Sequence, residues 1–340
     1  MGCGGKNNAI EFYRFFCTLI ICIHHSRRFI GNLNWLKHGY ICVEFFFILS
    51  GILLYKSFSK ERVHSTLTYV KKRFIRLWPE YAFAAIIEII VGWVCLHDFN
   101  LSKAVNELMM VQNTGLFRLG GYNYPCWYIP IMLFCGIIIY GLLTMYKETF
   151  RKLLAPIIIM CGYTYIWGLD TGLENWKYIN FISVPVIRGI CAMSIGVLIA
   201  ILLERGVQEY INIYFGTLIE VICILLIGIG LITDVSTDML TIVVFAMLLF
   251  ITFGEKSNIS GIYLNKNVWV KLSKYAYSIY LNHAIIIYGL SLIDNHILAL
   301  PNSVKPILTF ASIGLYAFFA KQFTDKLWGS LSKKFIIKNI

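Results

Sequence analysis

The sequence predicts an all-α protein, a polytopic bundle of about ten transmembrane helices. Three observations support this prediction: 58% of the 340 residues are hydrophobic, only 14% are charged, and the mean hydropathy is +0.70. A soluble globular domain is less apolar, and about a quarter of its residues are charged. The chain is therefore expected to be a multi-pass membrane protein.

About ten apolar runs, each of roughly 17 to 25 residues, are long enough to cross the hydrocarbon core as helices. They cover residues 9–25, 39–56, 79–97, 125–146, 153–169, 179–203, 213–233, 238–254, 274–294 and 304–324. No internal repeat or low-complexity linker separates these runs. Residues 1–340 are therefore expected to form a single membrane domain without an extramembrane catalytic domain.

The net charge of +12 raises the question of nucleic acid binding, but the positions of the basic residues argue against it. If the N-terminus is cytoplasmic, most of the 30 lysines and arginines fall in connections on that side. This asymmetry is the positive-inside rule of membrane proteins. Both termini are therefore expected on the cytoplasmic side of the cell membrane, and no nucleic acid partner is expected. The two most basic segments carry Lys56, Lys60, Arg62, Lys71, Lys72, Arg73 and Arg76, and Lys321, Lys326, Lys333, Lys334 and Lys338.

The ten cysteines are scattered through the apolar runs. They form no CxxC pair and no zinc-like Cys/His spacing, so they are predicted to pack as small apolar side chains. No metal site is expected.

The first run contains RFFCTLIICIHH, residues 14–25, with Arg14 at one end and His25 at the other. Eleven residues (25 − 14) turn a helix through about three turns, so the two side chains share one face about 16 Å apart. Within the bilayer an unpartnered charge costs on the order of 2.5 to 3.5 kcal/mol, so this face is expected to point inward. The alternative is that Arg14 pairs with Glu11 one turn earlier and that His25 marks the membrane interface.

The second run contains VEFFFILSG, residues 43–51, which places Glu44 near the depth of His25. A carboxylate beside an imidazole fixes its tautomer and raises its basicity, so the pair is a candidate general base. The alternative is a pair between Glu44 and Arg27 or Arg28. Ser50 and Gly51 follow, and packing alone would explain a small pair at a helix contact.

Arg73 and Arg76 stand three residues apart in KKRFIRLWPEY, residues 71–81. This spacing puts both guanidinium groups on one face of a helical turn, and such groups bind phosphate oxygens well. An ordinary positive-inside loop or a contact with lipid headgroups is the alternative.

Polar residues also interrupt two later runs. Tyr280 and His283 lie in KYAYSIYLNHAIII, residues 274–287, and are expected to face the bundle interior or a water-filled cavity. A histidine hydrogen-bonded between helices is the alternative. Arg188, in the sixth run, needs a counter-ion, water or an anionic ligand.

These residues resemble the integral-membrane acyltransferase-3 family, whose members modify extracytoplasmic glycans and related acceptors. Four motifs match in order over essentially the whole chain. They are Arg-x10-His at Arg14 and His25, acidic-x-F-F-x-x-S-G from Glu44 to Gly51, R-x-x-R-x-x-P at Arg73, Arg76 and Pro79, and S-Y-S-x-Y-L-x-H in YAYSIYLNH ending at His283. The chain departs from the family at Glu44, where Asp is common, and at Asn282, where Trp is common.

The resemblance implies an O-acyltransferase that moves an acyl group, acetyl by analogy, from cytoplasmic acyl-coenzyme A to a hydroxyl of an extracytoplasmic glycan or lipid-linked sugar. On this basis Arg73 and Arg76 are expected to hold the coenzyme A phosphates, and Arg14 to contact the coenzyme in a channel. His25, oriented by Glu44, is expected to activate the acceptor hydroxyl. Ser50, Tyr280, His283 and Arg188 are expected to line the same pocket.

Many relatives append an extracytoplasmic hydrolase-like domain, so this chain is expected to transfer directly or to use a partner transferase. Direct transfer and a transient acyl-enzyme both fit the sequence. The competing hypothesis is a transporter or flippase for an anionic or lipid-linked solute, although the inverted repeats and broken helices typical of such proteins are not found. A third hypothesis is a membrane domain that serves sensing or uptake beside a separate enzyme.

Overall fold

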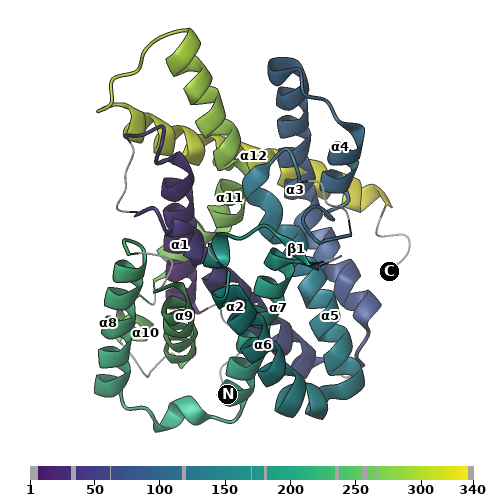
Figure 1. The fold of residues 1–340 in the computed structure, drawn as a ribbon, viewed down its shortest axis with the longest axis vertical. Coiled ribbons are helices and arrows are strands. Elements are labelled where there is room, and N and C mark those ends of the chain that lie inside the picture. Colours follow the sequence, from purple (N-terminus) through teal and green to yellow (C-terminus); the bar gives the residue numbers. More distant parts are fainter. Residues whose placement is uncertain are drawn as a thin grey trace.

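The computed structural model describes residues 7–31, 36–61, 63–116, 120–169, 171–179, 182–233, 237–254, 259–264 and 266–335, with side chains to residue 329. These residues form a helical bundle with one short antiparallel pair of strands (Figure 1). The α-helices are α1 (Asn8–Ser26), α2 (Cys42–Lys60), α3 (Thr66–Leu96), α4 (Leu101–Leu108), α5 (Tyr128–Thr149), α6 (Ala155–Trp167), α7 (Val184–Glu204), α8 (Ile213–Gly230), α9 (Asp238–Phe253), α10 (Ile259–Tyr263), α11 (Asn267–His296) and α12 (Lys305–Phe335).

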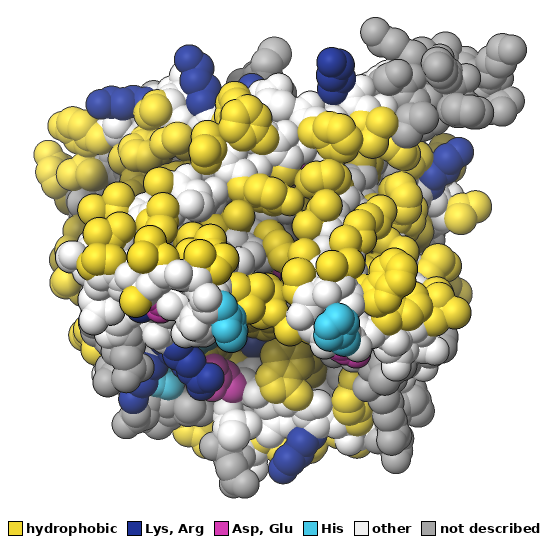
Figure 2. Space-filling view, turned by 90° about the horizontal axis from the view of Figure 1, so that it is seen from above, with side chains coloured by type: hydrophobic (Ala, Val, Ile, Leu, Met, Phe, Trp, Pro, Cys, Tyr) yellow, Lys and Arg dark blue, Asp and Glu magenta, His cyan; other side chains and the backbone are white. Residues whose placement is uncertain are grey.

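Shorter elements connect these helices. They are the 3-10 turns η2 (Gly39–Ile41), η3 (Tyr124–Trp127), η5 (Gly172–Glu174) and η6 (Val207–Tyr210), the π turn η4 (Phe150–Leu154), and the strands β1 (Tyr178–Ile179) and β2 (Ile182–Ser183). The α3–α4 and α11–α12 connections lie at the upper end of the bundle, and η6 lies at the lower end (Figure 1). Seen from the upper end, apolar side chains cover most of the surface and basic side chains are few and scattered (Figure 2).

The all-α membrane fold is confirmed, because every predicted run corresponds to a helix. Among the described residues, seven helical stretches are long and apolar enough to cross a membrane. One stretch of 44 residues, Tyr124–Trp167, contains two predicted runs that continue through η4. Two predicted runs fall outside the seven: α1, which carries Glu11 and Arg14, and α9, which is apolar but only 16 residues long. Residues 1–6 and 336–340, which were expected on the cytoplasmic side, lie outside the described residues.

Helix α3 begins much earlier than predicted, at Thr66 rather than at residue 79. The Ser65 side chain caps the helix by accepting a hydrogen bond of 3.3 Å from the Thr68 backbone N–H. Pro79 therefore lies inside the helix instead of at its first turn. As a result, Arg73 and Arg76 lie on a helix and not in a loop.

Helices α2 and α7 approach each other at two glycines. A Cβ on Gly51 would collide with the backbone of Met193, and a Cβ on Gly196 would collide with the backbone of Ile48. This close approach confirms the packing explanation for Gly51. Glu44, Ile48 and Gly51 are spaced i, i+4 and i+7, so they lie on one face of α2. The face that carries Glu44 therefore packs against α7.

Candidate active site

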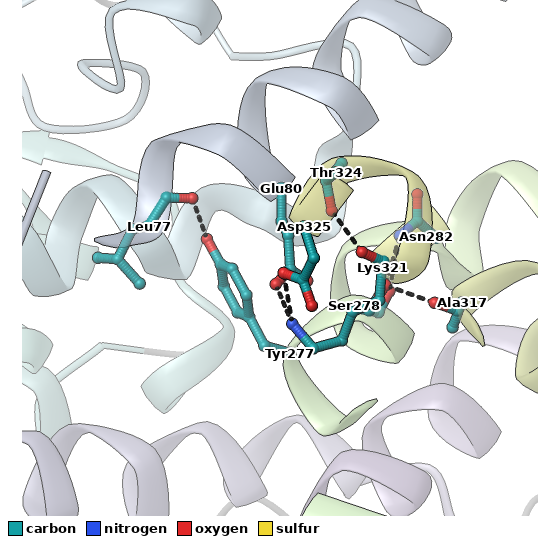
Figure 3. A network of polar contacts seen from close by, with 9 residues as sticks. All are labelled: Leu77, Glu80, Tyr277, Ser278, Asn282, Ala317, Lys321, Thr324 and Asp325. Atoms are coloured by element: carbon teal, nitrogen blue, oxygen red, sulfur yellow. Dashed lines mark hydrogen bonds and ion pairs between the residues drawn. The ribbon is translucent and has the colours of Figure 1, made fainter. Parts of the chain in front are cut away.

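Helix α11 is fixed to its neighbours by side chains one to two turns before His283 (Figure 3). The Tyr277 hydroxyl donates a hydrogen bond of 3.1 Å to the Leu77 carbonyl on α3. The Ser278 hydroxyl donates one of 2.9 Å to the Ala317 carbonyl on α12. Both bonds satisfy polar groups inside the bundle and set the rotation of α11 about its axis.

An ion pair joins α3 to α12 in the same region (Figure 3). The Lys321 ammonium lies 2.7 Å from Glu80 and 3.3 Å from Asp325. Because α3, α11 and α12 are linked in this way, the position of His283 is fixed by three helices.

His25 and His283, predicted as separate polar sites, are direct partners. His25 Nδ1 lies 2.7 Å from His283 Nε2, and the two rings are nearly parallel, with an interplanar angle of 15° and centroids 5.0 Å apart. His283 is fully buried, whereas His25 is partly exposed. His283 Nδ1 also lies 2.6 Å from the Tyr280 carbonyl oxygen.

These contacts assign the tautomers of both rings. The Tyr280 carbonyl can only accept, so His283 Nδ1 carries the proton and donates it. His283 Nε2 then has a lone pair and accepts from His25 Nδ1–H. In a neutral imidazole the other nitrogen is unprotonated, so His25 Nε2 keeps its lone pair. The arrangement can take a proton at His25 Nε2.

The segment that contains η3 lies beside this pair. The Asn123 side-chain amide donates a hydrogen bond of 2.8 Å to the Leu281 carbonyl, and the Tyr280 hydroxyl donates to the Pro125 carbonyl. The Tyr124 ring then meets the His25 ring edge-on, with centroids 5.4 Å apart at 82°. Tyr124 is 57% exposed, so one aromatic face beside His25 is open.

Glu107 at the end of α4 holds the same segment from the other side. Its carboxylate accepts hydrogen bonds from the backbone N–H groups of Tyr122, at 2.6 Å, and Asn123, at 3.0 Å. Burial nevertheless raises the pKa of Glu107 to about 6. The position of Tyr124 thus depends on a buried carboxylate outside the membrane-spanning helices.

Arg14 forms the ion pair that the sequence offered as the alternative. Its guanidinium donates to Glu11 at 2.8 Å, and the Ser273 hydroxyl of α11 also donates to Glu11. Helix α1 is therefore attached to α11 at both ends, through Glu11–Ser273 and through His25–His283. Arg14 keeps 27% of its side chain exposed, so the ion pair does not bury it completely.

The three arginines predicted to bind the donor form one group. Arg14 and Arg73 lie close enough to Arg76 for their charges to act on it. The Arg73 guanidinium also lies 5.5 Å from the centre of the Tyr69 ring. The ion pairs of the described residues include neither Arg73 nor Arg76. The Glu11 charge also acts on Arg76, but its ion pair is with Arg14. Three positive charges beside one carboxylate suit an anionic ligand.

Tyr128 and Tyr280 lie between this arginine group and the histidine pair. The Ser50 hydroxyl lies 3.0 Å from the Tyr128 hydroxyl. The charges of Arg14 and Arg73 act on Tyr128, and its ring meets the Tyr280 ring edge-on at 6.1 Å. Tyr280 in turn holds His283 through its carbonyl. Two tyrosines thus link the arginine group to His283 inside the bundle, through a ring contact and a backbone hydrogen bond.

Glu44 does not contact His25, which corrects the sequence-based expectation. Its carboxylate pairs with the Arg188 Nε of α7 and accepts a hydrogen bond of 3.1 Å from the Tyr163 hydroxyl. The physical reason is the rotation of α2, because the glycine contacts turn the Glu44 face toward α7. The counter-ion that Arg188 was expected to need is therefore Glu44.

The two other nitrogens of the Arg188 guanidinium also donate hydrogen bonds. Nη1 donates to the Leu173 carbonyl at 3.2 Å, and Nη2 donates to the Tyr40 carbonyl at 3.1 Å. The guanidinium lies 5.2 Å from the centre of the Trp127 ring. A buried pair with this many partners acts as a structural joint between η2, α2, η5 and α7.

Comparison with known proteins decides the family. The model of the acyltransferase-3 family, described as an acyltransferase domain, matches residues 7–321. The chain belongs to the acyltransferase-3 family.

A further comparison covers less of the chain. The chain is 29% identical over 109 residues to "Protein 2 in picA locus" of Rhizobium radiobacter, an alignment that covers 31% of this chain and 56% of that protein. The match thus spans about half the length of this curated relative. No solved structure matches the chain.

Two further features lie outside the histidine pair and the arginine group. A cavity of about 400 Å³ opens near the ends of α2 and α7, away from the histidine pair. It is lined by Tyr55, Lys56, Ser59, Lys60, Ala200, Leu203, Glu204, Gln208 and Phe253. Within the described ranges, no group of three or more His, Cys, Asp or Glu side chains could hold a metal ion.

The sequence did not identify Tyr124 and Tyr128 as parts of the candidate site. Both lie in NYPCWYIP, residues 123–130, where tyrosine and tryptophan are also ordinary residues of a membrane interface. The contact between Tyr124 and His25 depends on how η3 docks on α11. That docking uses backbone carbonyls, which no sequence motif records.

Proposed function

We propose that the protein is an O-acyltransferase of the cytoplasmic membrane that moves an acyl group, acetyl in the first instance, from cytoplasmic acyl-coenzyme A to a hydroxyl of an extracytoplasmic glycan or lipid-linked sugar. The observation that carries this proposal is the His25–His283 pair, whose hydrogen bonds leave a lone pair on His25 Nε2. A fixed, partly exposed imidazole in a chain of this family is a candidate general base.

In the proposed reaction His25 Nε2 accepts the proton of the acceptor hydroxyl while the oxygen attacks the thioester carbonyl. The bond from carbonyl carbon to sulfur breaks, and the leaving coenzyme A thiolate takes the proton from His25. The His25 imidazolium donates through Nδ1 to His283 Nε2, so its charge is stabilised during the reaction. A general base of this type contributes roughly 10²-fold to 10⁴-fold to the rate.

The donor is proposed to bind through the arginine group. Arg73 and Arg76 contact the coenzyme A phosphates, and Arg14, on the same helix as His25, contacts the coenzyme further inside the bundle. The absence of carboxylate partners for Arg73 and Arg76 among the described residues supports this assignment. Glu44 and Arg188 are proposed to act by holding α2 and α7 together, and membrane lipids surround the bundle.

The site is proposed to work within this chain, without a partner transferase. Both histidines and all three arginines come from α1, α3 and α11, and α11 contacts both α1 and α3. The termini are proposed to face the cytoplasm, so that the arginine group lies near the inner leaflet and His25 nearer the outer one.

The test uses purified protein in sealed vesicles with acetyl-coenzyme A labelled in the acetyl group, and methyl glycosides of glucose, galactose, mannose and N-acetylglucosamine on the opposite side. The proposal predicts glycoside-dependent release of free coenzyme A and label in an ester of the sugar. Movement of sugar or label without coenzyme A release would indicate a transporter and contradict the proposal. No transfer to any of the four glycosides would also contradict it.

A further inference from the structure

Helix α3 carries a carboxylate on its inward face. Tyr81, Ala85, Glu88 and Gly92 are spaced i, i+4, i+7 and i+11, so they form one stripe along the helix. Tyr81, Ala85 and Gly92 are buried, so this stripe faces the bundle. The opposite, exposed face consists of apolar residues that suit lipid contact: Ile86, Ile90, Trp93 and Val94. Glu88 therefore points into the protein.

Glu88 has no polar partner among the described residues. Its Oε1 is buried and makes no hydrogen bond, and no ion pair includes it. Within the described part of the chain, the charged side chain that acts on it is Glu107, which carries the same sign. A carboxylate oxygen without a partner in this position is costly to bury, so it needs an explanation.

The depth of Glu88 follows from the register between α3 and α11. The contact between Tyr277 and Leu77 places these two residues at one level. Glu88 lies eleven residues (88 − 77), or about 16 Å, beyond Leu77, and His283 lies six residues (283 − 277), or about 9 Å, beyond Tyr277. Glu88 is therefore about 7 Å further than His283 toward the end that carries the α3–α4 connection.

Two tyrosines lie within range of the Glu88 charge. Its charge acts on the hydroxyls of Tyr124 of η3 and Tyr316 of α12. Tyr124 is also the residue whose ring meets His25 at 5.4 Å. An open carboxylate, an exposed aromatic ring and an imidazole with a free lone pair thus follow one another from the bundle end toward the base. Few, well-placed polar groups beside an aromatic surface are the usual composition of a small-molecule site.

We propose that Glu88 and Tyr124 form the acceptor subsite: the Glu88 carboxylate accepts hydrogen bonds from hydroxyl groups of a polyhydroxylated acceptor, Tyr124 packs against its apolar face, and a further hydroxyl lies at His25 Nε2. This inference rests on the proposed function and names the residues that select its acceptor. A carboxylate has two oxygens that only accept, so it favours a ligand with neighbouring O–H donors. The subsite therefore prefers a sugar to a simple alcohol.

The variant that tests the subsite is Glu88→Gln, which keeps the size of the side chain and removes the charge. The KM for the methyl glycoside is expected to rise by roughly tenfold or more, as for loss of a hydrogen bond to a charged group. The KM for acetyl-coenzyme A is expected to stay unchanged. The melting temperature is expected not to fall, because the replaced charge has no protein partner to lose.

Glu80→Gln is the matched control, since it is the same substitution two turns earlier on the same helix. Glu80 pairs with Lys321 at 2.7 Å (Figure 3), so its replacement is expected to lower the melting temperature. The glycoside KM of this control is expected to remain that of the wild type. The two variants thus separate acceptor binding from structural support.

Labelling with dicyclohexylcarbodiimide gives a second measurement that does not depend on turnover. The mass shift at Glu88 is expected to decrease when the methyl glycoside is present and not when acetyl-coenzyme A alone is present. An unchanged glycoside KM in Glu88→Gln, or labelling that the glycoside does not reduce, overturns the subsite while wild-type transfer leaves the proposed function intact. A wild type that transfers to no glycoside overturns the function itself.

Discussion

Two sets of charged or ionisable side chains in this bundle differ in how many of their polar groups the protein itself pairs. In the first, Arg188 meets Glu44 and two backbone carbonyls, and both side chains are buried. In the second, His25 is fixed through Nδ1 alone, and Arg73 and Arg76 have no ion-pair partner among the described residues. The comparison teaches that charge inside a membrane protein does not by itself indicate chemistry. A group whose hydrogen bonds and charge are paired within the protein supports the fold. A group with an unpaired donor, acceptor or charge is available to a ligand.

The largest effect is expected when the buried pair of Glu44 and Arg188 is broken. Arg188→Ala leaves the Glu44 carboxylate buried without a counter-ion, so the free energy of unfolding is expected to fall by about 3 to 5 kcal/mol. Titration with sodium dodecyl sulfate in mixed micelles measures this change. Arg151→Ala is the control, since Arg151 pairs with an exposed glutamate and such pairs contribute about 0 to 1 kcal/mol. Equal losses in the two variants would contradict the structural role of Arg188.

The next largest effect is expected for Arg73 and Arg76, which form no ion pair among the described residues. Replacing Arg73 and Arg76 together by Ala is expected to raise the KM for acetyl-coenzyme A by roughly hundredfold, because two charge-assisted hydrogen bonds are lost. The turnover number of the donor-saturated enzyme is expected to change little. The paired control replaces Lys71 and Lys72 by Ala, which removes the same charge from an exposed surface of the same helix. A fall in turnover number with unchanged donor affinity would be the contrary result.

Glu107 is an intermediate case, satisfied by two backbone donors yet penalised by burial. Burial raises the pKa of this carboxyl from 4.5 to about 6. A raised pKa means that the folded state binds the proton more tightly, so this stabilisation is present below pH 4.5 and is lost as the pH rises through 6. The loss is about 2 kcal/mol, since one pKa unit corresponds to about 1.4 kcal/mol. Stability measured between pH 4 and 7 is expected to show this decrease in the wild type, and the decrease should be absent in Glu107→Gln.

The smallest of the four effects is expected for His283, the hydrogen-bond partner of His25. His283→Ala removes the acceptor that fixes the His25 tautomer, so the turnover number is expected to fall by roughly tenfold, with a shifted pH–rate profile. The exposed His296 at the end of the same helix provides the control in His296→Ala. A variant with normal turnover and an unshifted profile would show that His283 has only a packing role.

Much of the fold was predictable, because long apolar runs in a membrane protein form transmembrane helices. The hydrocarbon core requires every backbone group to be satisfied within the segment, so apolar runs of sufficient length form helices. The boundary of α3 was not predictable in the same way. Its start at Thr66 depends on the Ser65 cap and on a basic, amphipathic first part that the hydropathy pattern does not include.

The candidate site was predictable in its residues and only partly in its pairings. The spacing of Arg14 and His25 and of Arg73 and Arg76 follows from helix geometry, which operates within one helix. Which helices face each other depends on contacts such as Gly51 against Met193, and these rotate Glu44 toward Arg188. The position of each residue along its predicted helix placed Glu44 and His25 at the same depth in the membrane. It contained no information on how each helix is rotated about its own axis. Glu88 had a usable signal, since it is a carboxylate in the middle of an apolar run.

The most direct test of the distinction between satisfied and open groups is the single-turnover rate of acetyl transfer in His25→Ala, measured on protein whose melting temperature matches that of the wild type. Loss of the base is expected to reduce this rate by roughly 10²-fold to 10⁴-fold while donor binding stays unchanged. A folded His25→Ala variant that transfers acetyl at the wild-type rate would contradict the account.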